Sequence, residues 1–131
     1  MIAAFASSSL IAEDAKSDTK TLTATAVKNV TPDEAEKLLK ENPKVIVLDV
    51  RTPEEFAKGH IAGAKNVDFT ESDFEKKIGQ LDKSRPYLLH CASGGRSSQA
   101  LPVLEAEKFS TIYHLKSGFN GWEKAGKPVV K

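Results

Sequence analysis

The sequence contains only one cysteine, Cys91, so no disulfide can form within the chain. Its three histidines are scattered and repeat no zinc-ligand spacing, and we therefore expect no metal site. Whatever chemistry Cys91 performs, it must perform as a free thiol. Because free cysteines are among the most buried residue types, the alternative is that Cys91 is an inert side chain in the core. The residues around Cys91 decide between the two interpretations.

The chain also lacks an excess of charge of either sign. It has 19 lysines and arginines against 18 aspartates and glutamates, which gives a net charge of +1. So small a charge produces no long-range field that would attract nucleic acid or acidic lipid, and small molecules and proteins are the expected partners. Of the 131 residues, 40% are apolar and 28% are charged. This composition predicts one globular domain that buries its core without disulfides or metals.

Residues 1–12 form an apolar run that is too short to span a bilayer, and no lysine or arginine precedes it. The polar residues 13–18 follow, and the whole stretch resembles the end of a secretory signal. We expect residues 1–22 to be a disordered or signal-like segment and residues 23–131 to form the domain. This favours export to the periplasm or the exterior, with the cytoplasm as the alternative, and no membrane insertion.

From about residue 23 onward, short apolar runs alternate with helical patterns, which is typical of a parallel α/β sheet. Buried strands are predicted at 45–48 and 87–90, a short strand near 65–67, and a last strand at 111–115. Thr31 and Thr52 each precede a proline and, three residues on, a glutamate, the pattern of a capped helix start. Further helices are expected at 72–78, at 97–109 and around Trp122.

Cys91 opens the segment Cys91-Ala92-Ser93-Gly94-Gly95-Arg96-Ser97, between a predicted strand and a predicted helix. Two adjacent glycines let the backbone adopt positive φ angles and turn several N–H groups toward one point. The helix that begins near Arg96 adds unpaired N–H groups and the positive end of its dipole. We expect these groups to lower the pKa of Cys91 and to make it reactive, at the sheet edge where α/β proteins bind ligands.

This segment resembles the active-site loop of rhodanese-like domains, and motifs on both sides extend the resemblance over about residues 27–131. The motifs are Asp49-Val50-Arg51 with Glu55-Phe56, residues 59–64 with Asn66, residues 115–122, and residues 126–129. Three residues depart from the family pattern. Ser117 stands where glycine is common, Lys108 replaces the glycine that usually ends the helix after the loop, and Pro102 lies inside that helix, where it is expected to cause a bend.

The resemblance implies a three-layer α/β fold in which helices flank a five-stranded, mainly parallel sheet. It also implies a sulfurtransferase that needs no cofactor, with Cys91 as the catalytic residue that cycles between thiol and persulfide. Separately, we expect the protein to be a monomer. Cys91 would take a sulfur atom from a small donor such as thiosulfate and pass it to cyanide or a thiol. The substrate-binding loop would consist of Ala92, Ser93, Gly94, Gly95, Arg96 and Ser97, and the supporting residues would be Asp49, Arg51 and His60.

The supporting side chains have structural interpretations too. Arg96 either faces the ligand or pairs with a carboxylate, and the sequence leaves both open. Arg51 is expected to reach Glu55 across one helical turn. His60 is expected to be a hydrogen-bonded structural residue, and His90 to point to the face of the sheet opposite Cys91. Phe119 and Trp122 are expected in the core.

Two other functions compete with sulfur transfer. Cysteine-dependent phosphatases resemble the His90-Cys91 and Arg96-Ser97 pattern, but they place five residues between Cys and Arg, whereas this loop has four. The shorter loop offers fewer N–H groups and suits one sulfur atom better than a phosphoryl group. The second alternative is a sulfur-relay carrier that delivers to an acceptor protein, or a non-catalytic binding module. The presence of Cys91 favours chemical competence.

Overall fold

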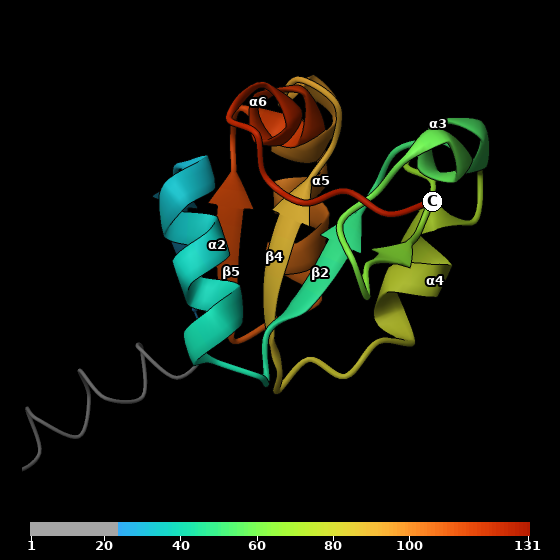
Figure 1. Ribbon diagram of the computed structural model, residues 1–131. Coiled ribbons are helices and arrows are strands. Elements are labelled where there is room, and N and C mark those ends of the chain that lie inside the picture. Colours follow the sequence, from blue (N-terminus) through green and yellow to red (C-terminus); the bar gives the residue numbers. More distant parts are fainter. Residues whose placement is uncertain (1–23) are drawn as a thin grey trace, which may run out of the picture.

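The computed structural model describes residues 24–131, and in this part of the chain five parallel strands form a single sheet in the order β1-β5-β4-β2-β3 (Figure 1). The strands are β1 (Ala26–Val30), β2 (Ile46–Asp49), β3 (Lys65–Asn66), β4 (Pro86–His90) and β5 (Thr111–Leu115). The helices are α2 (Pro32–Glu41), α3 (Pro53–Lys58), α4 (Phe74–Gly79), α5 (Gly95–Ala106) and α6 (Gly118–Lys124). The predicted three-layer α/β fold is confirmed.

Two hydrophobic clusters fill the space between the sheet and the helices on its two faces. Val47 and Leu88 belong to one cluster with residues of α2 and α6, and Leu48 and Leu89 belong to the other with residues of α4 and α5. Because neighbouring residues of a strand point to opposite faces, a strand covered on both sides must be apolar throughout. The unbroken apolar runs of β2 and β4 therefore reflect their central place in the sheet.

The two predicted capping boxes are both present. The Glu34 backbone N–H donates to Thr31 Oγ1 at 3.1 Å, and the Thr31 N–H donates to Glu34 Oε1 at 2.9 Å. Thr52 and Glu55 make the same pair of bonds at the start of α3, at 3.2 and 2.9 Å. Each box satisfies two N–H groups that a helix start leaves without partners, which fixes where α2 and α3 begin.

The helix after the Cys91 loop differs from the prediction at both ends. It begins at Gly95 and not at Ser97, because Gly94 takes a left-handed conformation (φ 103°) and serves as its N-cap. It ends at Ala106 and not at residue 109, because Lys108 is also left-handed (φ 65°) and turns the chain. Pro102 lies inside an unbroken α5, and the predicted bend remains a prediction.

The carboxyl ends of the strands meet at one edge of the sheet, beyond which α6 lies (Figure 1). The C-terminal segment returns to this edge, where His60 and Val130 form an isolated antiparallel bridge. Within residues 24–131, no helix combines the length and the apolar character that crossing a membrane requires. The predicted boundary at residues 22–23 and the signal-like segment lie outside the described residues.

Candidate functional site

Cys91 directly follows β4, and residues 91–94 connect it to α5. The side chain is 1% exposed and belongs to the cluster that contains Leu89 and Ala100. In position it is therefore a core cysteine. Its polar contacts decide whether it is also an inert one.

Hydrogen-bonding groups surround the sulfur atom. The Gly94 backbone N–H donates to Cys91 Sγ at 3.1 Å, and Sγ lies 3.4 Å from Ser97 Oγ. Burial alone would raise the pKa of the Cys91 thiol. Hydrogen bonds from the Ser97 hydroxyl and from the backbone N–H groups of Ser97, Gly94 and Ser93 outweigh burial, so that the pKa lies below its ordinary value. A thiol surrounded by donors favours its anionic form, in the direction that the sequence predicted.

The β5–α6 connection holds the loop in place. A side chain at Gly94 would collide with the carbonyl oxygen of Lys116, and one at Gly118 would collide with the carbonyls of Cys91 and Ala92. The N–H groups of Phe119 and Asn120 donate to those two carbonyls, at 2.8 and 3.0 Å.

Only one of the two loop glycines adopts the predicted positive φ. Gly94 is left-handed, whereas Gly95 is the first residue of α5, is not among the positive-φ residues, and has open space where a Cβ would lie. The prediction that both glycines supply positive φ was wrong for Gly95, since a helical residue needs no such conformation.

Arg96 pairs with a carboxylate, which is one of the two interpretations that the sequence left open. Its two terminal nitrogens donate to Glu55 Oε1 and Oε2 at 2.7 and 3.0 Å. The hydrogen bonds from Arg96 lower the pKa of Glu55 to about 2, against the opposing effect of burial. The site thus contains a fixed ion pair that joins α3 to the start of α5.

The prediction that Arg51 reaches Glu55 was wrong. Arg51 instead binds Asp49 through its Nε and Nη2, at 2.7–3.1 Å, and donates from Nη2 to the carbonyl of Gly59 at 2.8 Å. Its guanidinium also lies 4.1 Å from the centroid of the Phe119 ring. The physical reason is that Asp49 is fully buried and needs a cation, while the Glu55 carboxylate is occupied by its capping box and by Arg96.

The two histidines that the sequence assigned to structural positions occupy them. His60 Nδ1 binds the Phe56 carbonyl at 2.9 Å, and the two rings stack at 3.7 Å. His90 Nδ1 binds the Cys91 carbonyl at 3.0 Å, while its ring faces Phe119, on the side of the sheet opposite the Cys91 side chain. Phe119 and Trp122 are buried, as predicted.

His114 is a site residue that sequence reasoning missed. It lies on β5, where the sheet register places it beside Leu89, and its Nε2 lies 2.8 Å from Ser97 Oγ. Burial, followed by Lys116 and His90, lowers the pKa of His114. The available signal was a histidine in a predicted strand between Ile112 and Leu115, since a buried polar group requires a hydrogen-bond partner.

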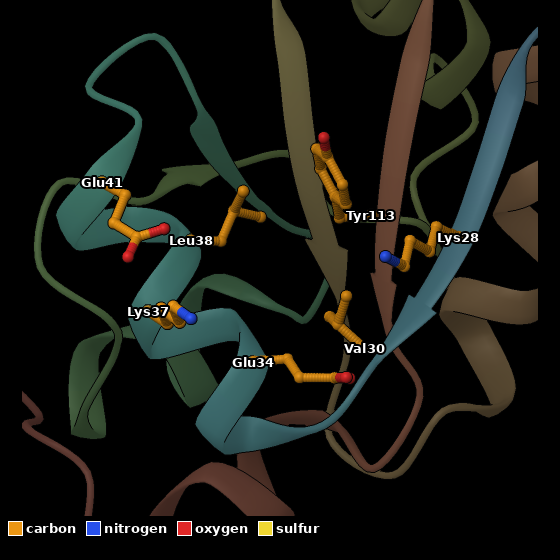
Figure 2. A pocket seen from close by; sticks show the side chains of 7 residues that line it. All are labelled: Lys28, Val30, Glu34, Lys37, Leu38, Glu41 and Tyr113. Carbon is orange, nitrogen blue, oxygen red and sulfur yellow. The ribbon is translucent and has the colours of Figure 1, made fainter.

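A hollow of about 230 Å³ borders the loop at Ala92 and is lined further by Arg51, Glu55, Lys58, Gly59, Phe119, Asn120 and Glu123. A separate groove of about 170 Å³ runs between α2 and the strands β1 and β5 (Figure 2). Its lining includes Lys28, Glu34 and Tyr113 but no residue of the Cys91 loop.

Among residues 24–131, no three His, Cys, Asp or Glu side chains gather closely enough to hold a metal ion.

Comparisons with known proteins agree with this geometry. A family model described as the rhodanese-like domain matches residues 31–125. Thiosulfate sulfurtransferase GlpE of Pseudomonas putida is 36% identical over 96 residues, which are 72% of this chain and 84% of that protein. A rhodanese-related protein from Thermoplasma volcanium superposes with a TM-score of 0.69 at 28% identity, over 79% of this chain and 97% of that chain. A rhodanese-like domain protein from Staphylococcus aureus superposes with a TM-score of 0.64 at 32% identity, over 72% of this chain and 90% of that chain.

Proposed function

The chain belongs to the rhodanese-like domain family, and we propose that it is a sulfurtransferase that carries a sulfur atom as a persulfide on Cys91. One observation carries the proposal. The chain's only cysteine lies at the carboxyl edge of the sheet with a backbone N–H and a hydroxyl at its sulfur, and with a pKa lowered despite burial. Such surroundings are typical of nucleophilic cysteines, and an inert core cysteine has no need of them.

The proposed reaction proceeds in two steps. The Cys91 thiolate attacks the outer sulfur of thiosulfate, a new S–S bond forms, and the S–S bond of the donor breaks so that sulfite leaves with the electron pair. Cyanide or an acceptor thiolate then attacks the outer sulfur of the persulfide. This attack releases thiocyanate or an acceptor persulfide and regenerates the Cys91 thiolate, so that sulfur atoms and charge balance without a cofactor.

The loop supplies hydrogen-bond donors for the anion that each step produces. The Gly94 N–H already points at Sγ, and the start of α5 directly follows, where unpaired N–H groups and the helix dipole favour negative charge. The proposed substrate-binding loop therefore consists of residues 92–97, which stabilise the persulfide mainly through backbone groups. Asp49, Arg51 and His60 act at a distance by holding the surrounding segments.

The ion pair between Arg96 and Glu55 and the length of the loop favour sulfur transfer over phosphatase chemistry. In such a phosphatase, a guanidinium beside the nucleophile directs its N–H groups at the transferring phosphoryl oxygens. Here both terminal nitrogens of Arg96 bind Glu55, and only four residues separate the arginine from Cys91. We therefore expect the protein to hydrolyse an aryl phosphate no faster than its Cys91→Ser variant.

Intact-protein mass spectrometry tests the proposal. Thiosulfate should add the mass of one sulfur atom to the chain under non-reducing conditions, and cyanide should then remove it. The Cys91→Ser variant should never acquire this mass. A wild-type chain that stays unmodified would refute thiosulfate as the donor. Cys91-dependent phosphatase turnover in a protein that forms no persulfide would make the phosphatase the correct assignment.

A further inference from the structure

The three histidines of the chain all lie within residues 24–131, and they differ in what their rings bind. His60 and His90 each place Nδ1 against a backbone carbonyl, at 2.9 and 3.0 Å. A carbonyl oxygen can only accept, so the proton of each neutral ring is fixed on Nδ1. His114 places Nε2 against the hydroxyl of Ser97, which can either donate or accept. Its ring proton is therefore free to occupy either nitrogen.

Ser97 connects His114 to the proposed nucleophile. Its Oγ lies 2.8 Å from His114 Nε2 and 3.4 Å from Cys91 Sγ, and the three side chains are only 0%, 2% and 1% exposed, respectively. The Gly94 carbonyl, at 3.3 Å, is the remaining acceptor near this hydroxyl. One hydroxyl proton serves one good acceptor at a time, so the direction of each bond in this chain depends on the others.

The protonation state of Cys91 sets these directions. In the thiol form, the S–H group donates to Ser97 Oγ, and the Ser97 hydroxyl donates to an unprotonated His114 Nε2. In the thiolate form, the sulfur can only accept, so the Ser97 hydroxyl turns toward it and His114 must offer an N–H from Nε2. The thiol proton has then passed to Ser97, the hydroxyl proton has passed to Nε2, and the Nδ1 proton has left for solvent. One proton is released in total, and the imidazole is neutral before and after.

We propose that His114 is a positioning residue for Cys91. By shifting its ring proton from Nδ1 to Nε2, His114 stabilises the Cys91 thiolate through Ser97. The inference deepens the proposed function and rests on it, because it concerns the same nucleophile. The charged and titratable groups that face the pair are Lys116 and His90 on the side of His114, and Arg96 on the side of Cys91. Burial, Lys116 and His90 disfavour an imidazolium at His114, which agrees with a neutral ring in both states.

The first test observes the ring directly. In protein labelled with ¹⁵N-histidine and kept reduced without any sulfur donor, the ring ¹⁵N shifts report which nitrogen carries the proton. We expect the His114 proton to move from Nδ1 to Nε2 over the pH interval in which iodoacetamide alkylation of Cys91 accelerates. His60 and His90 serve as internal controls that keep Nδ1–H, and the Cys91→Ala variant should show no such change. A His114 ring that keeps one tautomer across this interval overturns the inference.

A pair of variants supplies the second test. His114→Leu keeps an apolar side chain in the space of the ring but offers Ser97 no partner, whereas His114→Gln retains an amide that can donate or accept. We expect alkylation at pH 7 to slow about threefold in His114→Leu, because Ser97 loses the hydrogen bond from His114 that orients its hydroxyl toward the thiolate. In His114→Gln the alkylation rate should be largely restored. Equal rates in wild type and His114→Leu count against the inference. If the leucine variant does not fold, the measurement on the wild-type ring still decides.

These measurements separate this inference from the proposed function, because neither needs a sulfur donor. A protein that shows the coupled proton shift but never forms a persulfide would refute sulfur transfer alone. A protein that forms the persulfide while the His114 tautomer stays constant would refute the positioning role alone.

Discussion

At the scale of single residues, Glu55 connects the start of α3 to the Cys91 loop. Its Oε1 accepts from the Thr52 N–H at 2.9 Å, and both carboxylate oxygens accept from Arg96. The hydrogen bonds with Arg96 lower the pKa of Glu55 from 4.5 to about 2. Because the folded-state pKa lies below the unfolded value, the ionised carboxylate stabilises the fold above pH 4.5, and that stability is lost as the pH falls toward 2.

The Glu55→Gln variant tests this linkage, since it keeps an acceptor for the Thr52 N–H but removes the charge. At pH 7 we expect a loss of about 1 kcal/mol in the free energy of unfolding, the upper end for a partly exposed pair. The Glu55 side chain is 35% exposed, so solvent screening limits the effect. Urea denaturation at several pH values should show a smaller acid-induced loss than in wild type between pH 4.5 and 2. Glu54→Gln, on the exposed side of α3, is the control, and an unchanged acid dependence in Glu55→Gln would contradict the linkage.

The sequence predicted the nucleophile and its loop because their chemistry lies in consecutive residues. It could not assign the arginines, because Glu55 lies within sequence reach of Arg51 and the choice of partner depends on the burial of Asp49. It missed His114 because that residue meets Ser97 only through the pairing of β4 with β5, 17 residues further along the chain. Contacts made by tertiary pairing leave no local pattern to read.

At the scale of elements, the end of α5 carries a conformational cost. Lys108 adopts φ 65° just after the helix, and the Phe109 N–H then bonds the Leu104 carbonyl at 3.2 Å. Glycine is the usual residue in this conformation, because a Cβ makes the left-handed region unfavourable by about 1–2 kcal/mol. The turn is kept because it returns Phe109 to the core, where this side chain is 1% exposed.

Replacing Lys108 with glycine should therefore stabilise the protein. The free energy gained by relieving the backbone strain exceeds the free energy lost to the greater entropy of the unfolded chain. We expect a net gain of about 0.5–1 kcal/mol in the free energy of unfolding. Urea denaturation measures it. Lys37→Gly, on the exposed face of α2, is the matched control and should lose about 1 kcal/mol, because it places glycine inside a regular helix. A Lys108→Gly variant that is less stable than wild type would show that the lysine side chain contributes more than the strain.

The predicted helix ends differ from the observed ones for the same physical reason. Thr31 and Thr52 marked their helices correctly, because a hydroxyl cap and its glutamate partner are visible in the sequence. α5 starts and ends next to left-handed residues, and of these only Gly94 is of a type that signals the conformation. Lys108 gives no such signal, so the predicted helix extended beyond its true end.

At the scale of the whole molecule, Asp49 joins segments that are distant in the sequence. It ends β2, binds Arg51, and lies with Oδ2 3.7 Å from the His90 ring on β4. Its carbonyl accepts from the Val67 N–H at 2.9 Å, next to β3. Arg51 extends the connection to Gly59 and to the Phe119 ring of α6. The layered fold was predictable from alternating strand and helix patterns, whereas this buried junction depends on which strands become neighbours.

Replacing Asp49 with asparagine should therefore destabilise the whole domain. The Asp49 and Arg51 side chains are 0% and 5% exposed, and removal of one partner leaves a buried, uncompensated guanidinium. We expect a loss of about 3–5 kcal/mol in the free energy of unfolding, measured by urea denaturation at pH 7. Asp73→Asn is the control, because its pair with Lys77 spans 3.7 Å and both side chains are 47% exposed, so its loss should stay below about 0.5 kcal/mol. Equal losses in the two variants would mean that Arg51 finds enough compensation from the Gly59 carbonyl and the Phe119 ring, and that the junction does not depend on the Asp49 charge.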